Sequence, residues 1–487
     1  MRAASVRRGV LTALAAAALA GCAATVPEDA GFADVERVIA ERIPQHRVVW
    51  DRGSGEDLAV QAAVRELLAG ELTPDEAVQI ALLNNRGLQA TYEDLGIAQA
   101  DLVQAGLLSN PVFSAKARWT FDPSEGAELG FDLIQNFLDL LMLPARKRLA
   151  AVEFEETKLH VAREILDLAV ETREAYFAYQ AAEQTARVLR EIAAATQASY
   201  DLARRLDEAG NISERSLAAE QAALEQAKVD LAELEVTAYA ERERLNRLMG
   251  LWGQVTAEWT VLDGLPDLPP ETLPFERIEA VAIQGNLELA AAHKEVQALA
   301  TALGITRDYR WLGDVEVAIE YERETDDRNL LGPRIAFALP VFDQGQPRIA
   351  RAVALLRQSE HRLARRAVDI RSEVRAVRDR LVRLRDLAEH YRTVVIPLNQ
   401  RLVELSLQEY NYMLIGPFDV LTAKQNEIAA YRNYIETVRD WWIASAEVER
   451  LLGGQLVRAG AVRSGTPSPM ARAPSPPTDA HAHDGES

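Results

Sequence analysis

Hydrophobic residues recur at helical spacing over most of this chain and at strand spacing in four short stretches. From Lys147 to about Ala209 there is no Pro or Gly, and small or apolar residues alternate at four and three positions, the period of a coiled coil. The same spacing returns later and predicts a second seam at Val374, Val377, Leu381, Leu384, Ala388, Tyr391, Val395, Leu398, Leu402 and Leu405. Pro397 lies inside this seam and is expected to kink or break its helix.

The four stretches with a period of two predict strands at 112–121, 128–134, 315–322 and 334–341. Their charged residues fall on one face only. A half-buried sheet of a soluble protein shows the same alternation, but membrane strands of ~9–11 residues also place apolar side chains outward and polar ones inward. Four strands cannot close a transmembrane barrel, and an open sheet edge cannot lie in lipid. Several chains are therefore expected to share one barrel, with two chains giving eight strands or three giving twelve.

The chain also repeats itself, which predicts two duplicated halves. The segment from Leu72 to Pro111 has an echo that begins near Leu273, and Asn85 matches Asn286. Leu248-Met249-Gly250 closes the first half and Leu451-Leu452-Gly453 closes the second. We expect a first repeat at 72–263, a proline-rich linker at 264–274 and a second repeat at 275–454. Short helices and a linker occupy 22–71, and the Ser/Pro-rich tail at 463–487 is expected to be disordered.

The fold class expected from these patterns is mainly α with a small β part. The helix that opens the first repeat has a start signal, because Thr73 and Glu76 form a capping box. Two short turns, at 209–213 and 414–418, are expected to reverse the long helices. Gly210 and Asn211 suit the positive φ of such a turn, Ser213 suits a helix N-cap and Pro417 suits a first helical turn.

Charge and motifs argue against several functions. The net charge is −20, which disfavours a nucleic-acid partner. The sequence contains no zinc-protease motif, phosphate-binding loop or nucleophile elbow, so no catalytic residue is predicted. The histidines are scattered, and no metal site is predicted. His481 and His483 in the tail are weak candidates at best.

The N-terminus predicts export and a lipid anchor. Arg2, Arg7 and Arg8 precede an apolar run too short to span a bilayer, which is typical of a signal peptide at 1–21. Leu19, Ala20, Gly21 and Cys22 resemble a bacterial lipobox, in which Cys22 becomes the lipidated first residue; a plain secretory signal with a chance cysteine is the alternative. We expect this lipid to be the only covalently attached group, and we expect no cofactor. Ala23 follows the cysteine, and by resemblance to the sorting rule of enteric bacteria the absence of Asp at this position favours the outer membrane over retention in the inner membrane.

Several longer passages resemble one family. The sequences LTPDEAVQIALLNN, DLVQAGLLSNPVFS, PVFDQGQPRIARA and YNYMLIGPFDVLTAKQ are similar to those of the TolC-like outer-membrane efflux proteins. The resemblance implies a homotrimer in which each chain gives four strands to a twelve-stranded outer-membrane barrel and its helices to a periplasmic tunnel. It also implies two partners, a periplasmic adaptor (membrane fusion) protein and an inner-membrane pump of the resistance-nodulation-division type.

The resemblance assigns roles to the two turns. Residues of both turns would contact the adaptor: Gly210, Asn211, Ile212, Ser213, Ile415, Gly416, Pro417 and Phe418. Glu404, Glu409 and Tyr412 are the candidates for a gate near this tip, with exposure on the outer surface as the alternative. The implied function is passive export of heavy-metal cations or small toxic molecules. The alternatives are a type I protein-secretion channel and a lipid-anchored periplasmic coiled-coil scaffold with a soluble sheet.

Overall fold

The computed structural model describes residues 25–53, 55–119, 121, 127–269, 277–311, 315–324 and 328–454. The chain divides into two compact units, and each is built from three separate segments. The first, which we call the strand unit, contains Met1–Ile39, Ala90–Glu164 and Leu287–Asp369. The second, the helical unit, contains Ala40–Gln89, Ile165–Asn286 and Ile370–Ser487. Both repeats therefore contribute to both units.

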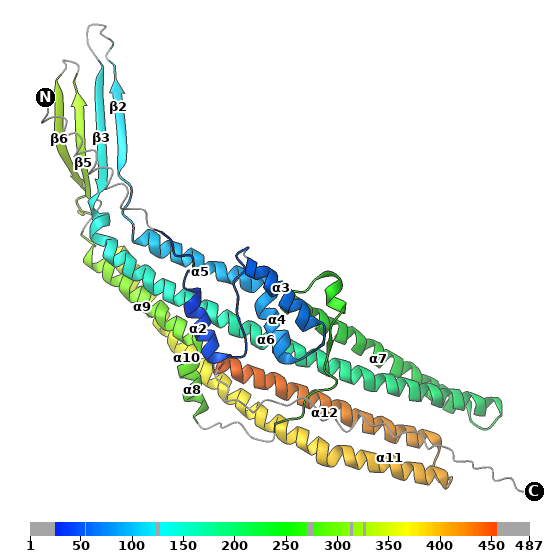
Figure 1. The fold of residues 1–487 in the computed structure, drawn as a ribbon. Coiled ribbons are helices and arrows are strands. Elements are labelled where there is room, and N and C mark those ends of the chain that lie inside the picture. The colour runs from blue at the N-terminus through cyan, green and yellow to red at the C-terminus, as the bar shows by residue number, and fades with distance from the viewer. Residues whose placement is uncertain are drawn as a thin grey trace, which may run out of the picture. The chain divides into compact units, whose positions relative to one another are not determined.

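The strand unit contains a four-stranded antiparallel sheet with the order β2-β3-β5-β6 (Figure 1). Its strands are β2 (Val112–Arg118), β3 (Glu128–Asn136), β5 (Val315–Arg323) and β6 (Asn329–Phe337). The four predicted strands are confirmed, but the predicted bounds of β2 and β6 are wrong. Strand β2 stops at Arg118, before Trp119 and Phe121. Strand β6 begins earlier than predicted and stops before Leu339, because Pro340 lacks an N–H and restricts the residue before it.

Helices of both repeats join this sheet. The strand unit contains α5 (Arg86–Ala105; its first four residues belong to the helical unit), α9 (Leu287–Asp308) and the first parts of α6 (Phe137–Glu208) and α10 (Gln346–His390). Helix α2 (Phe32–Arg42) begins in this unit and contacts α6 through the ion pair of Asp34 with Lys158, at 2.8 Å. Helix α6 starts before the predicted Lys147 and contains Pro144, which the sequence pattern did not anticipate.

The helical unit contains the two antiparallel helix pairs that the periodicity predicts. Helix α6 pairs with α7 (Glu214–Leu248), and α11 (Ile396–Asn411) pairs with α12 (Pro417–Leu451). Shorter elements are α3 (Gly55–Leu68), α4 (Pro74–Asn84), α8 (Ile278–Gly285), a 3-10 turn (Gly253–Ala257) and the parallel strands β1 (Glu71–Leu72) and β4 (Thr260–Val261). Helix α4 begins with the predicted capping box: Glu76 N donates to Thr73 Oγ1 at 3.2 Å, and Thr73 N donates to Glu76 at 2.8 Å.

The four helices of the two antiparallel pairs lie in the order α7, α6, α12, α11 (Figure 1). Ser199 on α6 donates to Glu220 on α7 at 2.7 Å. Phe177 on α6 stacks on Trp442 of α12, with ring centroids 5.1 Å apart. Gln400 on α11 donates to the hydroxyl of Tyr431 on α12 at 2.7 Å. The core of this unit surrounds Trp259, Tyr176 and Leu245, all fully buried.

The predicted seam of the second long helix is correct only in its first part. Val374, Val377, Leu381 and Ala388 are buried, as predicted. A π-helix at Tyr391–Val395 then separates α10 from α11, just before Pro397. Each π turn holds one extra residue, so the inward positions move to Ile396, which is buried, and to Asn399, Val403 and Ser406, which are half-buried. Leu398, Leu402 and Leu405, which the pattern placed in the seam, are instead exposed.

Among the described residues, none of the helices offers an uninterrupted apolar stretch of the length that a bilayer requires.

Candidate functional site

The sheet has one apolar and one charged face. Directly paired residues share a face, so the register gathers the apolar side chains on one side: Phe113, Leu133, Phe131, Ile319, Tyr321, Leu331, Ile335 and Phe337. Phe113, Phe131 and Tyr321 stack across three strands with ring centroids 6.1 Å apart at each step. Phe113 is 66% exposed and Leu331 is 73% exposed. A single chain thus leaves this apolar face uncovered.

The opposite face carries the charges. Its carboxylates are Glu128, Asp132, Glu316, Glu320 and Glu322, and its bases are Lys116, Arg118 and Arg334. Gly130 lies between Lys116 and Glu322 in the register. Since Gly130 has no side chain, the Lys116 amine lies 3.5 Å from Glu128 and 3.9 Å from Glu322, which is two strands away. Acidic groups outnumber basic ones on this face, which favours cations near it.

The first helix turn follows the prediction. Helix α6 ends at Glu208, and Gly210 takes a left-handed φ of 72°. Gly210 N donates to Asp207 O and Asn211 N donates to Leu206 O, both at 2.8 Å, the pattern of a Schellman C-cap. Ser213 then caps α7 by accepting a hydrogen bond from Ser216 N at 3.2 Å. The turn presents small and polar groups.

The second turn has the same backbone form with different chemistry. Met413 takes the left-handed φ of 59° that Gly210 takes in the first turn. Leu414 N donates to Glu409 O at 2.9 Å, and Gly416 N donates to Asp419 at 3.0 Å before Pro417 opens α12. Tyr412, Met413 and Leu414 are 77%, 93% and 72% exposed. The sequence had placed the turn at 414–418 and had singled out Tyr412, but Met413 and its left-handed φ were missed, because a non-glycine residue carries no signal for that conformation. Ile415 and Phe418 are half-buried beside Met413.

The three gate candidates lie where predicted, on the last turns of α11 and at its end, but they form no cluster. Glu404 is paired with Arg401 at 2.9 Å. Glu404 and Glu409 lie roughly 140° apart around the helix. Tyr412 is the C-cap residue of α11. All three side chains are exposed, and their role as a gate stays a prediction.

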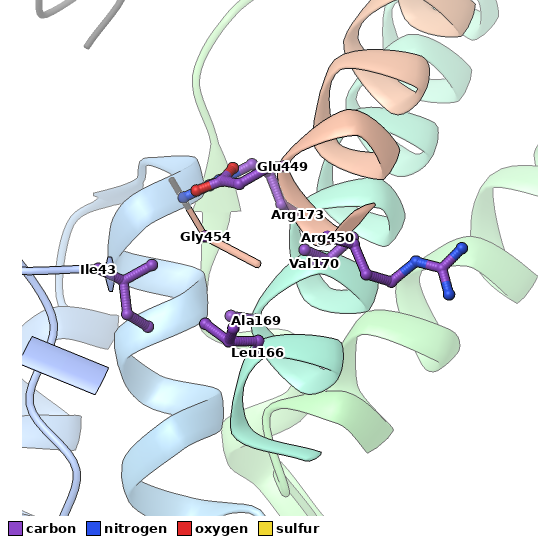
Figure 2. Close-up of a pocket in the computed structure, with 8 residues that line it drawn as sticks. All are labelled: Ile43, Leu166, Ala169, Val170, Arg173, Glu449, Arg450 and Gly454. Atoms are coloured by element: carbon purple, nitrogen blue, oxygen red, sulfur yellow. The ribbon is translucent and has the colours of Figure 1, made fainter. Parts of the chain in front are cut away.

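A largely buried ion pair joins α6 to α12 near a small cavity (Figure 2). Arg173 contacts Glu449 and also lies 3.1 Å from Asp75 of α4. Burial raises the pKa of Glu449, although Arg173 opposes this effect. The cavity, of about 10 Å³, is otherwise lined mainly by apolar residues, among them Ile43, Leu166 and Val170. Its small size and apolar lining suit a packing joint better than a ligand site.

The remaining predicted site lies outside the described residues: the lipobox residues Leu19, Ala20 and Gly21 and the lipidation residue Cys22. In the described part of the chain, histidine, cysteine and carboxylate side chains do not gather in groups of three that could hold a metal ion.

An uncovered amphipathic sheet and long helices from two repeats define a class of protein, the outer-membrane channels with a helical extension. The family model of the outer membrane efflux proteins matches residues 77–251 of this chain. Proteins of this family are outer-membrane efflux channels, which are transporters and not enzymes.

Known proteins support this assignment. The chain is 23% identical over 401 residues to the cobalt-zinc-cadmium resistance protein CzcC of Cupriavidus metallidurans, covering 79% of this chain and 91% of CzcC. Its fold matches the outer membrane channel CmeC of Campylobacter jejuni with a TM-score of 0.68 at 16% identity, over 80% of this chain and 87% of that one. It also matches CusC with a TM-score of 0.66 at 14% identity, over 79% and 93% of the two chains.

Proposed function

We propose that this chain is the exit duct of a tripartite pump that exports divalent heavy-metal cations across the outer membrane. The observation that carries the proposal is the sheet, which has an uncovered apolar face and a charged face rich in carboxylates. The similarity to CzcC, a cobalt-zinc-cadmium resistance protein, over 91% of its length favours metal cations as the cargo. A wide aqueous duct does not select its cargo, so selectivity would reside in the inner-membrane pump.

The duct would be a homotrimer. In the described sheet, β2 and β6 each have one edge without a partner strand. Such edges cannot remain unpaired in lipid, so β6 of one copy would pair with β2 of the next. Two copies would give eight strands and a lumen filled by side chains, whereas three give twelve strands and room for hydrated ions.

The two helix turns would meet a periplasmic adaptor protein, which would join the duct to a pump of the resistance-nodulation-division type. Residues 210–213 would supply a polar contact and residues 415–418, with their apolar neighbours, a hydrophobic one. Glu404, Glu409 and Tyr412 would narrow the duct near this end. A lipid on Cys22 would anchor each copy to the outer membrane.

A susceptibility panel on a deletion strain tests the proposal. The strain is complemented with wild type or with Cys22→Ala and exposed to cobalt, zinc and cadmium salts, and in parallel to dyes, detergents and antibiotics. Sensitivity to metals alone, rescued by wild type, supports metal export. Broad sensitivity to organic compounds would instead assign the duct to a drug pump, and no phenotype would favour protein secretion or a scaffold.

The trimer is tested separately by gel mobility. Wild-type protein in dodecyl sulfate should run as a trimer without heating and as a monomer after boiling. A monomer in gentle detergent would contradict the channel assembly. Cys22→Ala should lower the amount of protein in the outer-membrane fraction; unchanged recovery there would contradict a role for the lipid.

A further inference from the structure

Three segments of the strand unit meet at the end of the sheet where the chain enters the helices. They are the start of α6, the end of α9 and residues 338–345, which lead into α10 (Figure 1). The hydroxyl of Tyr309 donates to the carbonyl of Leu141 at 3.2 Å, which joins the end of α9 to the start of α6. Gly345 packs against Arg310, which joins the third segment to α9. The three segments therefore form one surface next to the sheet.

This surface exposes apolar side chains. Phe342 is 98% exposed and Leu339 is 71% exposed, although both lie beyond the end of β6. The other exposed apolar residues of the three segments are Phe137, Leu140, Leu141, Trp311 and Val341. Exposed apolar surface therefore extends past the ends of the strands onto the helices.

Exposed bases lie just beyond these apolar residues. We call them the basic band, and they are Lys147, Arg148, Arg307, Arg310, Arg348 and Arg351, all exposed. Together, residues 137–151, 303–311 and 338–351 contain seven basic and three acidic residues, in a chain whose net charge is −20. The seventh base, Arg146, is paired with Asp139 at 3.3 Å. The basic band is thus a local positive surface on an acidic protein.

On the exposed side of α6, apolar residues give way to bases along the helix axis. Leu141, Pro144 and Arg148 follow at intervals of three and four residues, so they lie on one side of the helix. Lys147 lies seven residues after Leu140, beside them, and all five residues are exposed. From Leu141 to Arg148 the axis rises roughly 10 Å. This rise is comparable with the depth over which a bilayer changes from acyl chains to headgroups.

Helices α9 and α10 show the same order of apolar and basic groups. The guanidinium of Arg310 lies 4.7 Å from the ring centroid of Trp311. Both side chains combine an apolar body with a polar end, which suits a membrane interface. On α10, Arg348 and Arg351 lie one turn apart on one side of the helix, and the exposed Phe342 precedes them. Three segments that are distant in sequence therefore share one polarity.

We propose that the basic band binds the phosphate groups of the phospholipid leaflet on the helix side of the sheet. It would prefer lipids with a net negative charge, such as phosphatidylglycerol, over zwitterionic phosphatidylethanolamine, because bases near a membrane surface attract anionic lipids. A leaflet fits better than a protein partner, since it presents an apolar layer and a phosphate layer in this order to all three segments. The inference rests on the membrane duct proposed above and adds a lipid preference to it.

The test compares the full-length wild-type protein with two variants of four substitutions each. The band variant carries Lys147→Gln, Arg148→Gln, Arg348→Gln and Arg351→Gln. The matched control carries Arg204→Gln, Arg205→Gln, Arg215→Gln and Lys228→Gln. Each set removes one lysine and three arginines, and all eight side chains are exposed. The control residues lie in the helical unit, away from the three segments.

Native mass spectrometry provides the measurement. Each protein in detergent receives equal amounts of phosphatidylglycerol and phosphatidylethanolamine, and the bound lipids are counted. The ratio of bound phosphatidylglycerol to bound phosphatidylethanolamine should fall roughly three-fold in the band variant and stay at the wild-type value in the control. Equal ratios for wild type and the band variant would overturn the inference.

A third variant separates charge from local structure. Lys147→Arg with Arg148→Lys, Arg348→Lys and Arg351→Lys keeps every charge and should keep the wild-type ratio; a loss of preference there would overturn the inference. A lower dissociation temperature of the trimer in dodecyl sulfate for the band variant would place these bases between copies and would also overturn it.

Flotation with vesicles of phosphatidylethanolamine and phosphatidylglycerol distinguishes two kinds of failure. If the wild-type protein does not float with the vesicles, the proposed membrane duct itself fails. If it floats but binds the two lipids equally in the mass spectra, only the lipid preference of the basic band fails.

Discussion

Asn85 donates a hydrogen bond from its side-chain amide to the backbone carbonyl of Leu248, with 2.8 Å between the two atoms. The second repeat has the same contact, from Asn286 to the carbonyl of Leu451 at 3.5 Å. Each asparagine follows the first short helix of its repeat and holds the last residue of its final helix. In the first repeat Asn84 adds hydrogen bonds to Met249 and Gly250.

The second repeat has Gly285 at the position of Asn84 in the first repeat. The second repeat therefore lacks the side-chain amide that donates these hydrogen bonds in the first. Arg42 of the N-terminal segment takes this place and donates to the carbonyls of Gly285 and Gly453. The N-terminal segment thus completes a joint that the duplicated half lacks. The two repeats close in the same way with different residues.

Replacing Asn85 should weaken the first joint. Asn85 also caps α5, because Leu88 N donates to its Oδ1 at 2.9 Å. Asn85→Ala removes both interactions and should destabilise the protein by about 1–3 kcal/mol, measured as a lower thermal midpoint in detergent. Asn211→Ala, at an exposed turn, is the control and should change stability little. Equal midpoints for the two variants would contradict the role of this joint.

Two glycines with the same backbone conformation should respond differently to alanine. Gly250 has a φ of 67° and Gly210 has a φ of 72°. A Cβ at Gly250 would clash with the carbonyl oxygen of Asn84, whereas nothing lies within 4 Å of one at Gly210. Gly210→Ala should lower the free energy of unfolding only by the cost of a left-handed alanine, about 1–2 kcal/mol. Gly250→Ala should lower it by clearly more, because the clash adds to that cost. Thermal midpoints of both variants, measured side by side, check this order; a reversed order would refute the close approach.

The sequence predicted the positions of helices and strands better than it predicted which face of a helix is buried. Alternation and capping residues are local signals, so the four strands, the Thr73 capping box and the Ser213 cap could be found. The side chains that are buried beyond Ala388 could not be predicted. One extra residue in a π-helix rotates every later residue around the helix axis but leaves the sequence spacing of the leucines unchanged. The ion pair of Arg173 and Glu449 joins residues distant in sequence, and no local pattern indicates such a pair.

That ion pair gives a prediction with a pH signature. Arg173→Met leaves the Glu449 carboxylate buried without its partner, which should cost about 3–5 kcal/mol at neutral pH. Burial already raises the pKa of Glu449, and loss of Arg173 should raise it further. The destabilisation relative to wild type should therefore shrink as the pH is lowered and Glu449 takes up a proton. Thermal midpoints at neutral and acidic pH measure this, and a loss independent of pH would contradict it. Arg173→Met with Glu449→Leu should recover part of the stability.

The charged face of the sheet should set the ion preference of the open duct. Glu316, Glu320 and Glu322 lie on this face of β5. Changing all three to Gln should reduce the ratio of cation to anion permeability by roughly two-fold, because these carboxylates concentrate cations near the wall. Reversal potentials in planar bilayers under a KCl gradient provide the measurement. Glu233→Gln, which removes an exposed carboxylate from α7, is the control, and an equal effect there would exclude a special role for the sheet.

His46 should make the helical unit sensitive to acid. Its side chain is buried, its Nε2 lies 3.3 Å from the carbonyl oxygen and 3.9 Å from the carboxylate of Asp75, and its Nδ1 has no partner among the described residues. Burial lowers the pKa of His46; Asp75 opposes this and Arg173 adds to it.

A lowered pKa means that the unfolded chain binds the proton first. The stability contributed by neutral His46 is full above its unfolded pKa of about 6.5 and is lost as the pH falls from there through the folded pKa. His46→Leu should remove this loss, so its thermal midpoint should fall less than that of wild type between about pH 7.5 and pH 5.5. His160, which is exposed on α6, is the matched control as His160→Leu. Parallel curves for wild type and His46→Leu would show that another group carries the acid response.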